Sequence, residues 1–319
     1  MAALYVVSAQ AAAGKTAICA GMGKSLQDAG KKVGFLKPGA DGGDAAFMNQ
    51  VLALPEAVES LSPPAGDISR VKEAFARVAA GKDVVLLEGR LDIGTLDAAR
   101  ELDARVIVIE DYSQPAEGTG YEGFSPGLLG VIVNKVPTSQ MERVRVEAAA
   151  RLGGAGIKVL GVLPEARALA ALTVGQLAES IQGKILNNSE KSSELAQNYM
   201  LGAMVVGSGL DYFGRKADKA AVIRNDRPDM QLAALETPTR CLVIAGGAAQ
   251  PIYSVRYKAE KKGIPIILAE GETNTVVAGI EAALNNARFS KAKKLPKLVE
   301  IMRQQLDLRA IYGSLGLAA

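Results

Sequence analysis

The stretch LYVVSAQAAAGKT, residues 4–16, decides the fold of this chain. Its apolar first half predicts a buried strand, and the alanine-rich turn after it leads into a helix that begins with a lysine and a threonine. Such a turn binds phosphate through backbone N–H groups and the helix N-terminus, while the lysine reaches the β- and γ-phosphates and the threonine hydroxyl ligates Mg²⁺. We therefore predict a phosphate-binding loop, the P-loop, with the nucleotide-binding residues Ala12, Ala13, Gly14, Lys15 and Thr16.

The P-loop pattern departs from its usual form at one position. The pattern G-x-x-x-x-G-K-[ST] has a glycine where this chain has Ala9. An ordinary strand–turn–helix that contains Gly-Lys-Thr by chance is therefore the alternative. The place of the motif, directly after a strand and at the start of a helix, favours nucleotide binding.

Composition sets the broad class of the protein. A length of 319 residues predicts two domains, and 49% hydrophobic residues suffice for two cores. A net charge of +3 gives no basis for a nucleic-acid partner, and no apolar run reaches the ~18 residues of a membrane span. The strand expected at the N-terminus leaves no room for a signal peptide. Cys19 and Cys241 are expected as buried side chains in a reducing compartment, so we predict a cytoplasmic protein.

The chain contains no histidine. This excludes Ser-His-Asp and Cys-His nucleophilic catalysis, zinc sites with histidine ligands and histidine general bases. Any chemistry must therefore use lysine, carboxylates, hydroxyl groups and a bound Mg²⁺.

Residues 1–168 alternate short apolar runs with helical patterns and are predicted to form the nucleotide-binding domain. Strands are expected at 4–8, 33–36, 83–88, 106–110, 129–134 and 158–163, with helices at 15–29, 44–52, 68–80, 95–102 and 139–152. This alternation predicts an α/β fold, a mainly parallel sheet with helices on both faces. Ligands of such sheets bind at the carboxyl ends of the strands, where Lys37, Glu88 and Asn134 fall.

Residues 169–290 are predicted to form a second, smaller α/β domain. Helices are expected at 173–181, 230–235 and 253–262, with strands at 184–187, 220–223, 241–245 and 265–269. In the turn at 225–229, Arg227 either binds an anion or a neighbouring subunit, or only stabilises the turn. Residues 291–319 are expected as a helical extension with one helix at 295–311.

Four polar residues of the first domain are candidates for chemistry. Lys37 is expected to face an anionic substrate or the γ-phosphate, unless it is only a solvated lysine at a strand end. Asp44 is expected to cap a helix that begins at Ala45 or, alternatively, to ligate Mg²⁺. Glu88 closes a buried strand, the position at which a P-loop protein holds Mg²⁺ or orients a water, with a solvated strand end as the alternative.

Asn134 closes a further apolar run and is expected to contact the nucleotide base through its side-chain amide. The guanine-selective pattern N-K-x-D is incomplete, because Pro137 stands in place of the aspartate. Adenine is therefore favoured over guanine.

In this order, the segments SAQAAAGKT, FLKPG, LLEG, VIVNKV and VLGVLPE resemble dethiobiotin synthetase and the related N-terminal domain of long phosphotransacetylases. This resemblance covers about residues 1–164. The remainder is similar to the DRTGG domain through its turn at 226–229, the helix at 230–235 and LVIAGG at 242–247. Together they resemble the regulatory N-terminal part of long phosphotransacetylases. No acetyl-transfer domain follows in this chain, so we expect no such activity from it alone.

The resemblance also implies residue roles. Lys15 and Thr16 would bind phosphate and Mg²⁺, Glu88 and Asp44 would be the metal-side carboxylates, Lys37 would engage an amine substrate and its carbamate, and Asn134 would contact the base. Three departures on the substrate side are Gln10 for an aspartate, Asp41 for a serine, and Arg90-Leu91 for a glycine-rich continuation. Substrate recognition of the synthetase type is therefore not implied. In the second domain, Pro228 and Asp229 replace Thr and Gly of the namesake motif.

These observations lead to one main prediction and two alternatives. The main prediction is a regulatory protein that binds ATP and Mg²⁺, hydrolyses ATP slowly with Lys37 and Glu88 as catalytic residues, self-associates through its second domain and has a metabolic enzyme as partner. The first alternative is an ATP-dependent carboxylase or ligase of the dethiobiotin synthetase class, in which Lys37 holds an amine or carbamate. The second is an interaction module with a vestigial nucleotide pocket, which Ala9 and Gln10 favour.

Overall fold

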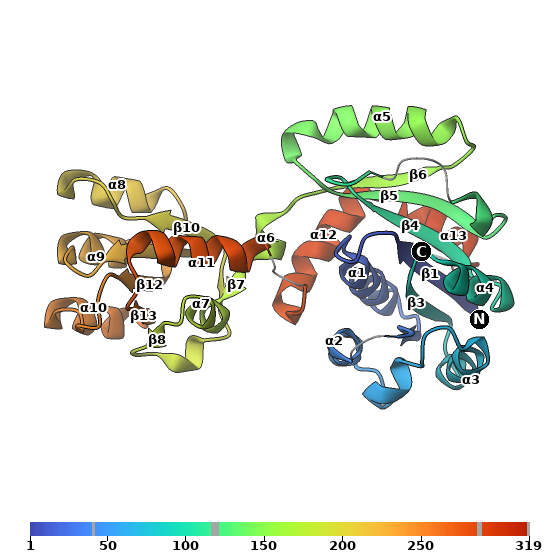
Figure 1. Cartoon of the computed structure of the whole chain (residues 1–319), viewed down its shortest axis with the longest axis horizontal. Coiled ribbons are helices and arrows are strands. Elements are labelled where there is room, and N and C mark those ends of the chain that lie inside the picture. Colours follow the sequence, from blue (N-terminus) through green and yellow to red (C-terminus); the bar gives the residue numbers. More distant parts are fainter. Residues whose placement is uncertain (40–41, 116–120, 286–288, 318–319) are drawn as a thin grey trace. The chain divides into compact units, whose positions relative to one another are not determined.

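The computed structural model describes residues 1–39, 42–115, 121–285 and 289–317, and it divides into two compact units (Figure 1). Unit 1 comprises Met1–Ala166 and Phe289–Ala319, and unit 2 comprises Arg167–Arg288. Each unit has a mainly parallel sheet covered by helices, which confirms the predicted fold class. Within the described ranges, no helix is long and apolar enough to cross a membrane.

Unit 1 is built on six parallel strands in the order β2-β3-β1-β4-β5-β6. These are β1 (Ala2–Ser8), β2 (Val33–Leu36), β3 (Val84–Arg90), β4 (Arg105–Asp111), β5 (Leu128–Val136) and β6 (Val159–Pro164). The strand order reverses at β1, since β2 and β3 lie on one side of it and the later strands on the other. Parallel sheets bind ligands at such a reversal, outside the carboxyl ends of the strands, which we term the carboxyl edge. The P-loop begins there, at the end of β1.

Helices cover both faces of this sheet (Figure 1). Leu86 lies against Gly23 of the first helix, whereas the preceding residue, Val85, lies with Val78 on the other face, because successive side chains of a strand point in opposite directions. The helices α1 (Lys15–Asp28), α2 (Gly43–Leu52) and α12 (Leu295–Gln305) pack together; α3 (Ile68–Ala79) packs beside α4 (Ile93–Glu101), and α5 (Met141–Gly153) on β5 and β6. Short 3₁₀ helices lie at Val58–Leu61, Glu122–Phe124, Thr138–Gln140 and Ala292–Lys294.

The C-terminal segment differs from its prediction of one helix at 295–311. Helix α12 ends at Gln305, and Leu306 is extended and forms a β-bridge with Gly161 of β6. A backbone that pairs with a strand cannot continue an α-helix, so a new helix, α13 (Leu308–Ser314), begins after Asp307, whose carboxylate accepts the N–H of Ala310. The segment belongs to unit 1 and packs on α1 and β6.

Unit 2 has a five-stranded sheet in the order β10-β11-β12-β13-β8, in which the edge strand β8 is antiparallel to β13. Alternate strand residues face two apolar clusters: Ala221 and Ile223 face α8, α9 and α10, whereas Ala220 and Val222 face α7 and α11. The strands are β8 (Lys184–Ile185), β10 (Asn198–Leu201), β11 (Lys219–Arg224), β12 (Thr239–Ala245) and β13 (Ile266–Ala269), with a separate ribbon of β7 (Leu172–Thr173) and β9 (Leu195–Ala196). The helices are α6 (Arg167–Ala170), α7 (Val174–Ser180), α8 (Gly209–Gly214), α9 (Pro228–Leu235), α10 (Tyr253–Lys262) and α11 (Thr273–Asn285), with 3₁₀ turns at Ser189–Lys191 and Val206–Ser208.

Several elements of unit 2 were not predicted. Strand β10 buries only Met200 and lacks a run of β-branched residues, which is the usual sequence signal of a parallel strand. Helix α11 contains Val276, Val277 and Gly279, which lower its intrinsic helix propensity. The two cysteines are free and buried, as predicted.

Candidate functional site

The P-loop connects Ser8, the last residue of β1, to Lys15, the first residue of α1. Gly14 caps this helix with φ +96°, a left-handed conformation that favours glycine. A Cβ atom at Gly14 would lie 2.4 Å from Nδ2 of Asn134. Backbone conformation and close packing therefore both require glycine at this position.

The ammonium group of Lys15 is held by the loop itself. Its Nζ donates to Oγ of Ser8 at 2.7 Å and to the carbonyl oxygen of Gln10 at 3.3 Å. The side chain is buried, and this burial lowers the pKa of Lys15 although Glu88 acts in the opposite direction. The structure thus keeps a desolvated lysine directly under the P-loop.

The next three candidates meet at the carboxyl edge of the sheet. Thr16 Oγ1 donates to Oε1 of Glu88 at 2.9 Å, and Lys37 Nζ donates to the same oxygen at 2.6 Å. Glu88 is only 2% exposed, and burial raises the pKa of its carboxyl group even though Lys37 opposes this shift. Burial alone would lower the pKa of Lys37, but Glu88 and the carboxylate of Asp44 raise it above its usual value.

The predicted capping role of Asp44 is wrong. Helix α2 begins at Gly43, and its N-cap is Gly42, which makes no side-chain cap and has φ +85°. Asp44 lies in the first helical turn, and its carboxylate accepts a hydrogen bond from Lys37 instead. Charge-assisted hydrogen bonds are stronger than neutral ones, which favours this pairing. Asp41 lies outside the described residues.

The residues around Glu88 fit Mg²⁺. Oε2 of Glu88 is buried and has no hydrogen-bond partner among the residues that the structure describes. The same side chain contacts Thr16 and, through Lys37, Asp44. These are hard oxygen ligands of the kind that Mg²⁺ prefers. Within residues 1–39, 42–115, 121–285 and 289–317, no three Cys, Asp or Glu side chains cluster as a metal site. The two carboxylates of Glu88 and Asp44 suit the usual coordination of Mg²⁺, which binds one or two carboxylates and completes its shell with water and substrate phosphates.

Asn134 lies on the other side of the P-loop, where its amide braces the loop backbone. Nδ2 donates to the carbonyl oxygen of Ala13 at 2.8 Å, and Oδ1 accepts the N–H of Lys135 at 2.9 Å. Lys135 has φ +62°, an uncommon conformation for a side-chain-bearing residue, and its Nζ lies 2.7 Å from Oδ2 of Asp111. The pair with Lys135 and hydrogen bonds from Ser113 lower the pKa of Asp111 despite its burial.

Three contacts that shape the site were not predicted from the sequence. Oγ of Ser8 accepts a hydrogen bond from Lys15, and the carboxylate of Asp111 forms an ion pair with Lys135. Gln10 donates through Nε2 to the carbonyl oxygen of Gln114 at 2.7 Å. A signal was present for Asp111, because it directly follows the run at 106–110, as Glu88 follows the run at 84–87. The structure therefore adds the end of β4 to the site.

In the turn at 225–229 of unit 2, Arg227 forms an ion pair with Asp229 of the same turn. Nη2 of Arg227 donates to the carbonyl oxygen of Met204 at 2.9 Å and to Oδ2 of Asp229 at 2.8 Å. Asp229 lies in the first turn of α9, where its negative charge is also favourable. The guanidinium group of Arg227 thus stabilises the turn in this structure.

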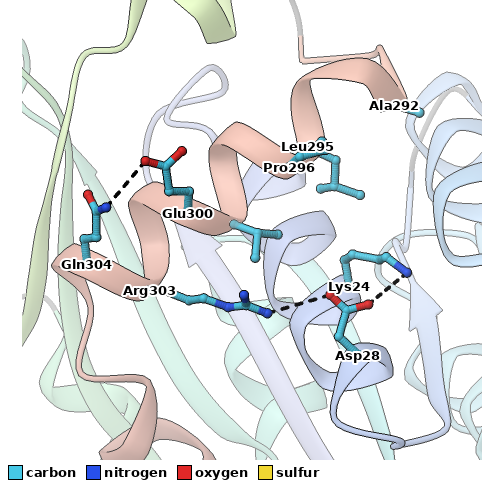
Figure 2. A pocket seen from close by; sticks show the side chains of 9 residues that line it. Lys24, Asp28, Ala292, Leu295, Pro296, Glu300, Arg303 and Gln304 are labelled. Atoms are coloured by element: carbon cyan, nitrogen blue, oxygen red, sulfur yellow. Dashed lines mark hydrogen bonds and ion pairs between the residues drawn. The ribbon is translucent and has the colours of Figure 1, made fainter.

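A hollow of about 570 Å³ lies in unit 1 between α1 and α12 (Figure 2). Figure 2 shows apolar Leu295 and Pro296 beside a charged rim, in which Asp28 pairs with Lys24 at 3.0 Å and with Arg303 at 3.7 Å. All lining residues come from the last turns of α1 and from residues 292–304. None of the candidate residues lines this hollow, so it is separate from the P-loop site.

Comparison with known proteins identifies the families of two domains in this chain. The CobQ/CobB/MinD/ParA nucleotide binding domain matches residues 4–177, and the DRTGG domain matches residues 176–283. A phosphate acetyltransferase of Pseudomonas putida is 25% identical over 97% of this chain and 55% of its own length. A hydrogenobyrinate a,c-diamide synthase of Mycobacterium tuberculosis is 28% identical over 51% of this chain and 39% of its own. The matched part of this chain therefore spans 39–55% of the length of these relatives.

Among solved structures, a cobyrinic acid a,c-diamide synthase from Mycobacterium smegmatis with a bound ATP analogue and magnesium is 20% identical, with a TM-score of 0.40. The alignment covers 52% of this chain and 87% of that one. The family match, by contrast, covers more than half of the chain, including the P-loop, Lys37, Glu88 and Asn134. The chain therefore belongs to the CobQ/CobB/MinD/ParA nucleotide binding domain family and carries a DRTGG domain after its P-loop domain.

Proposed function

We propose that the chain binds ATP together with Mg²⁺ at the P-loop of unit 1 and acts as a regulatory protein that hydrolyses ATP slowly. This proposal rests on one observation: Thr16 and Lys37 both donate hydrogen bonds to Oε1 of Glu88, and Lys15 at the start of the same helix as Thr16 is buried. The ammonium groups of the two lysines would attract phosphate, and the side-chain oxygens of Thr16 and Glu88 would bind the metal.

Each residue has a role in this proposal. The backbone of 12–14 and Lys15 bind the phosphates, and Thr16, Glu88 and Asp44 hold Mg²⁺, which neutralises charge on the phosphates when bound. Hydrolysis requires an oriented water, for which the carboxylate of Glu88 or Asp44 is the acceptor. One amide hydrogen of Asn134 is used by Ala13, and the second is available to an adenine acceptor.

The wider role is proposed from the relatives. The alignment to an acetyltransferase covers 97% of this chain, and the two domains resemble the regulatory N-terminal part of long phosphotransacetylases. We therefore propose a cytoplasmic regulator of a metabolic enzyme that self-associates through unit 2. The oligomeric state of the purified chain with and without ATP, measured by light scattering, tests the self-association.

Isothermal titration with ATP, with and without Mg²⁺, tests the nucleotide site. Lys15→Ala should weaken ATP binding at least about tenfold, because it removes a charge-assisted contact to phosphate. Lys24→Ala is the matched control, since Lys24 lies on the same helix but pairs with Asp28 at an exposed position. If the wild type does not bind ATP, the chain is an interaction module with a vestigial pocket. If Lys15→Ala binds as tightly as the wild type, the assignment of the site is wrong.

A second candidate function is an ATP-dependent carboxylase or ligase of the dethiobiotin synthetase class. The position of Lys37 favours it, because its ammonium group lies beside Thr16 and Glu88 at the carboxyl edge, close to the expected γ-phosphate. Product formation from diaminopelargonate, CO₂ and ATP that is lost in Lys37→Ala would support this function. Absence of turnover with a protein that binds ATP would argue against it.

A further inference from the structure

The ammonium group of Lys37 contacts all three side chains that we assign to Mg²⁺. Its Nζ lies 2.6 Å from Oε1 of Glu88 and 3.4 Å from Oγ1 of Thr16, and it also donates to Oδ2 of Asp44. The lysine comes from the end of β2, which lies next to β3 and Glu88 in the sheet. A single cation from the protein itself therefore joins three side chains from three different elements.

This cation neutralises a carboxylate that water barely reaches. Glu88 is 2% exposed, and a buried carboxylate without a positive partner is strongly unfavourable. Lys37 supplies that partner, while Oε2 of Glu88 receives no hydrogen bond from the described part of the chain. The ion pair therefore compensates the charge of Glu88 but leaves the hydrogen-bonding capacity of its second oxygen unused.

Lys37 and Mg²⁺ compete for Oε1 of Glu88 and Oδ2 of Asp44, the two carboxylate oxygens that the lysine contacts. Mg²⁺ requires its oxygen ligands at ~2.0–2.1 Å in octahedral geometry, and the N–H groups of Lys37 point at the same oxygens. Two cations so close together in a poorly hydrated site repel each other strongly. Binding of the metal to these two oxygens therefore requires Lys37 to leave them.

We propose that Lys37 is a built-in cation that occupies the Mg²⁺ ligands of the nucleotide-free protein and leaves them when the metal binds. The inference rests on the proposed function, since it takes Thr16, Glu88 and Asp44 as the metal ligands. Lysine suits this role because its ammonium group is a point charge on a flexible four-carbon chain. Metal binding then releases Lys37 from these oxygens, so that the metal and the position of this lysine are coupled.

Binding of Mn²⁺ without nucleotide, followed by the electron paramagnetic resonance signal of free Mn²⁺, tests this coupling. Lys37→Met keeps an unbranched side chain one atom shorter than that of lysine but removes its charge, and it should bind Mn²⁺ at least about tenfold more tightly than the wild type. Lys37→Arg keeps a cation and should bind like the wild type. Lys135→Met is the matched control, because it removes a lysine paired with a different carboxylate, Asp111, at the same edge.

The stability of the variants is part of the design. Loss of Lys37 leaves Glu88 without its partner, so Lys37→Met is first checked for folding by circular dichroism. Lys37→Gln provides a second comparison, because its amide can still donate to Glu88 without carrying charge. Both neutral variants should show the tighter binding.

Three results would overturn the inference. These are equal or weaker Mn²⁺ binding by Lys37→Met and Lys37→Gln, no Mn²⁺ binding by any of the proteins, or a crystal structure with Mn²⁺ bound in which Lys37 still contacts Glu88. ATP titrations on the same samples keep the two proposals apart. ATP binding with unchanged Mn²⁺ affinity of the neutral variants contradicts only the exchange of cations, whereas tighter Mn²⁺ binding without ATP binding contradicts only the proposed function.

Discussion

The side-chain amide of Asn134 donates a hydrogen bond to the carbonyl oxygen of Ala13, 2.8 Å away, and so ties the end of β5 to the P-loop. The two residues are 121 positions apart in the sequence. The oxygen of the same amide accepts the backbone N–H of Lys135, which fixes which end of the amide faces the loop. The conformation of the P-loop therefore depends on a strand two places away from β1 in the sheet.

Replacing Asn134 with aspartate should weaken ATP binding about tenfold. A carboxylate cannot donate to the carbonyl oxygen of Ala13, and it places negative charge next to the phosphate site. Isothermal titration measures the change. Asn198→Asp is the matched control, because its amide makes a similar 2.8 Å bond to the carbonyl oxygen of Ala217 in unit 2. Equal ATP affinity of Asn134→Asp and the wild type would show that this bond does not support the loop.

Gly14→Ala should destabilise unit 1 by about 1–3 kcal/mol and reduce ATP binding. The left-handed conformation costs a non-glycine residue ~1–2 kcal/mol, and the new Cβ would lie 2.4 Å from Nδ2 of Asn134. Urea unfolding measures the loss. In the double variant Gly14→Ala/Asn134→Ala, the steric part should disappear and the conformational part should remain. Fully additive effects of the two substitutions would contradict the predicted contact.

Gly161→Ala should loosen the C-terminal helices by about 2 kcal/mol or more. A Cβ on Gly161 would lie 2.3 Å from the carbonyl oxygen of Gln305, and the residue has φ +157°. The clash falls where Leu306 bridges β6, so hydrogen exchange should increase in α12 and α13. Gly153→Ala is the control, because a Cβ added there would meet only open space among the described residues, and exchange should not change. Unchanged protection of both helices in Gly161→Ala would refute the prediction.

The sequence predicted all six strands of unit 1 and the placing of Lys37 directly after β2, but β3 and β5 each continue two residues past Glu88 and Asn134, which were expected to end them. These features depend on local signals, because a short apolar run bounded by a turn is enough to mark a buried strand. The contacts that these residues make were harder to predict from the sequence. The pairing of Asp44 with Lys37 and of Asn134 with Ala13 depends on how strands associate, which a single sequence does not specify.

Tertiary contacts also account for the differences from prediction at the C-terminus and in unit 2. Residues 295–311 have a continuous helical pattern, and only the tertiary bridge between Leu306 and Gly161 interrupts it. Strand β10 is short and buries little, so its existence depends on β11 beside it rather than on its own residues. Tertiary context overrides local propensity in both cases.

Lys219 should make the stability of unit 2 depend on pH in the alkaline range. Its side chain is fully buried on β11, where Nζ donates to the carbonyl oxygens of Lys216 and Pro238, each at 3.1 Å. Burial lowers the pKa of Lys219 to about 8, whereas the unfolded chain keeps a value near 10.5. Between these values the unfolded chain binds more protons than the folded one. The free energy of unfolding should therefore rise with pH, by at most about 1.4 kcal/mol per pH unit.

Lys219→Met should remove this dependence, because methionine carries no proton. Urea unfolding of both proteins at about pH 7.5 and about pH 9.5 measures the difference between their slopes, so that other titrating groups cancel. Lys216→Met is the control, since this exposed side chain shares the neighbourhood and its backbone carbonyl is retained. It should keep the slope of the wild type. Parallel pH profiles of Lys219→Met and the wild type would mean that Lys219 keeps its proton in the folded protein, and that the two carbonyl oxygens offset the cost of its burial.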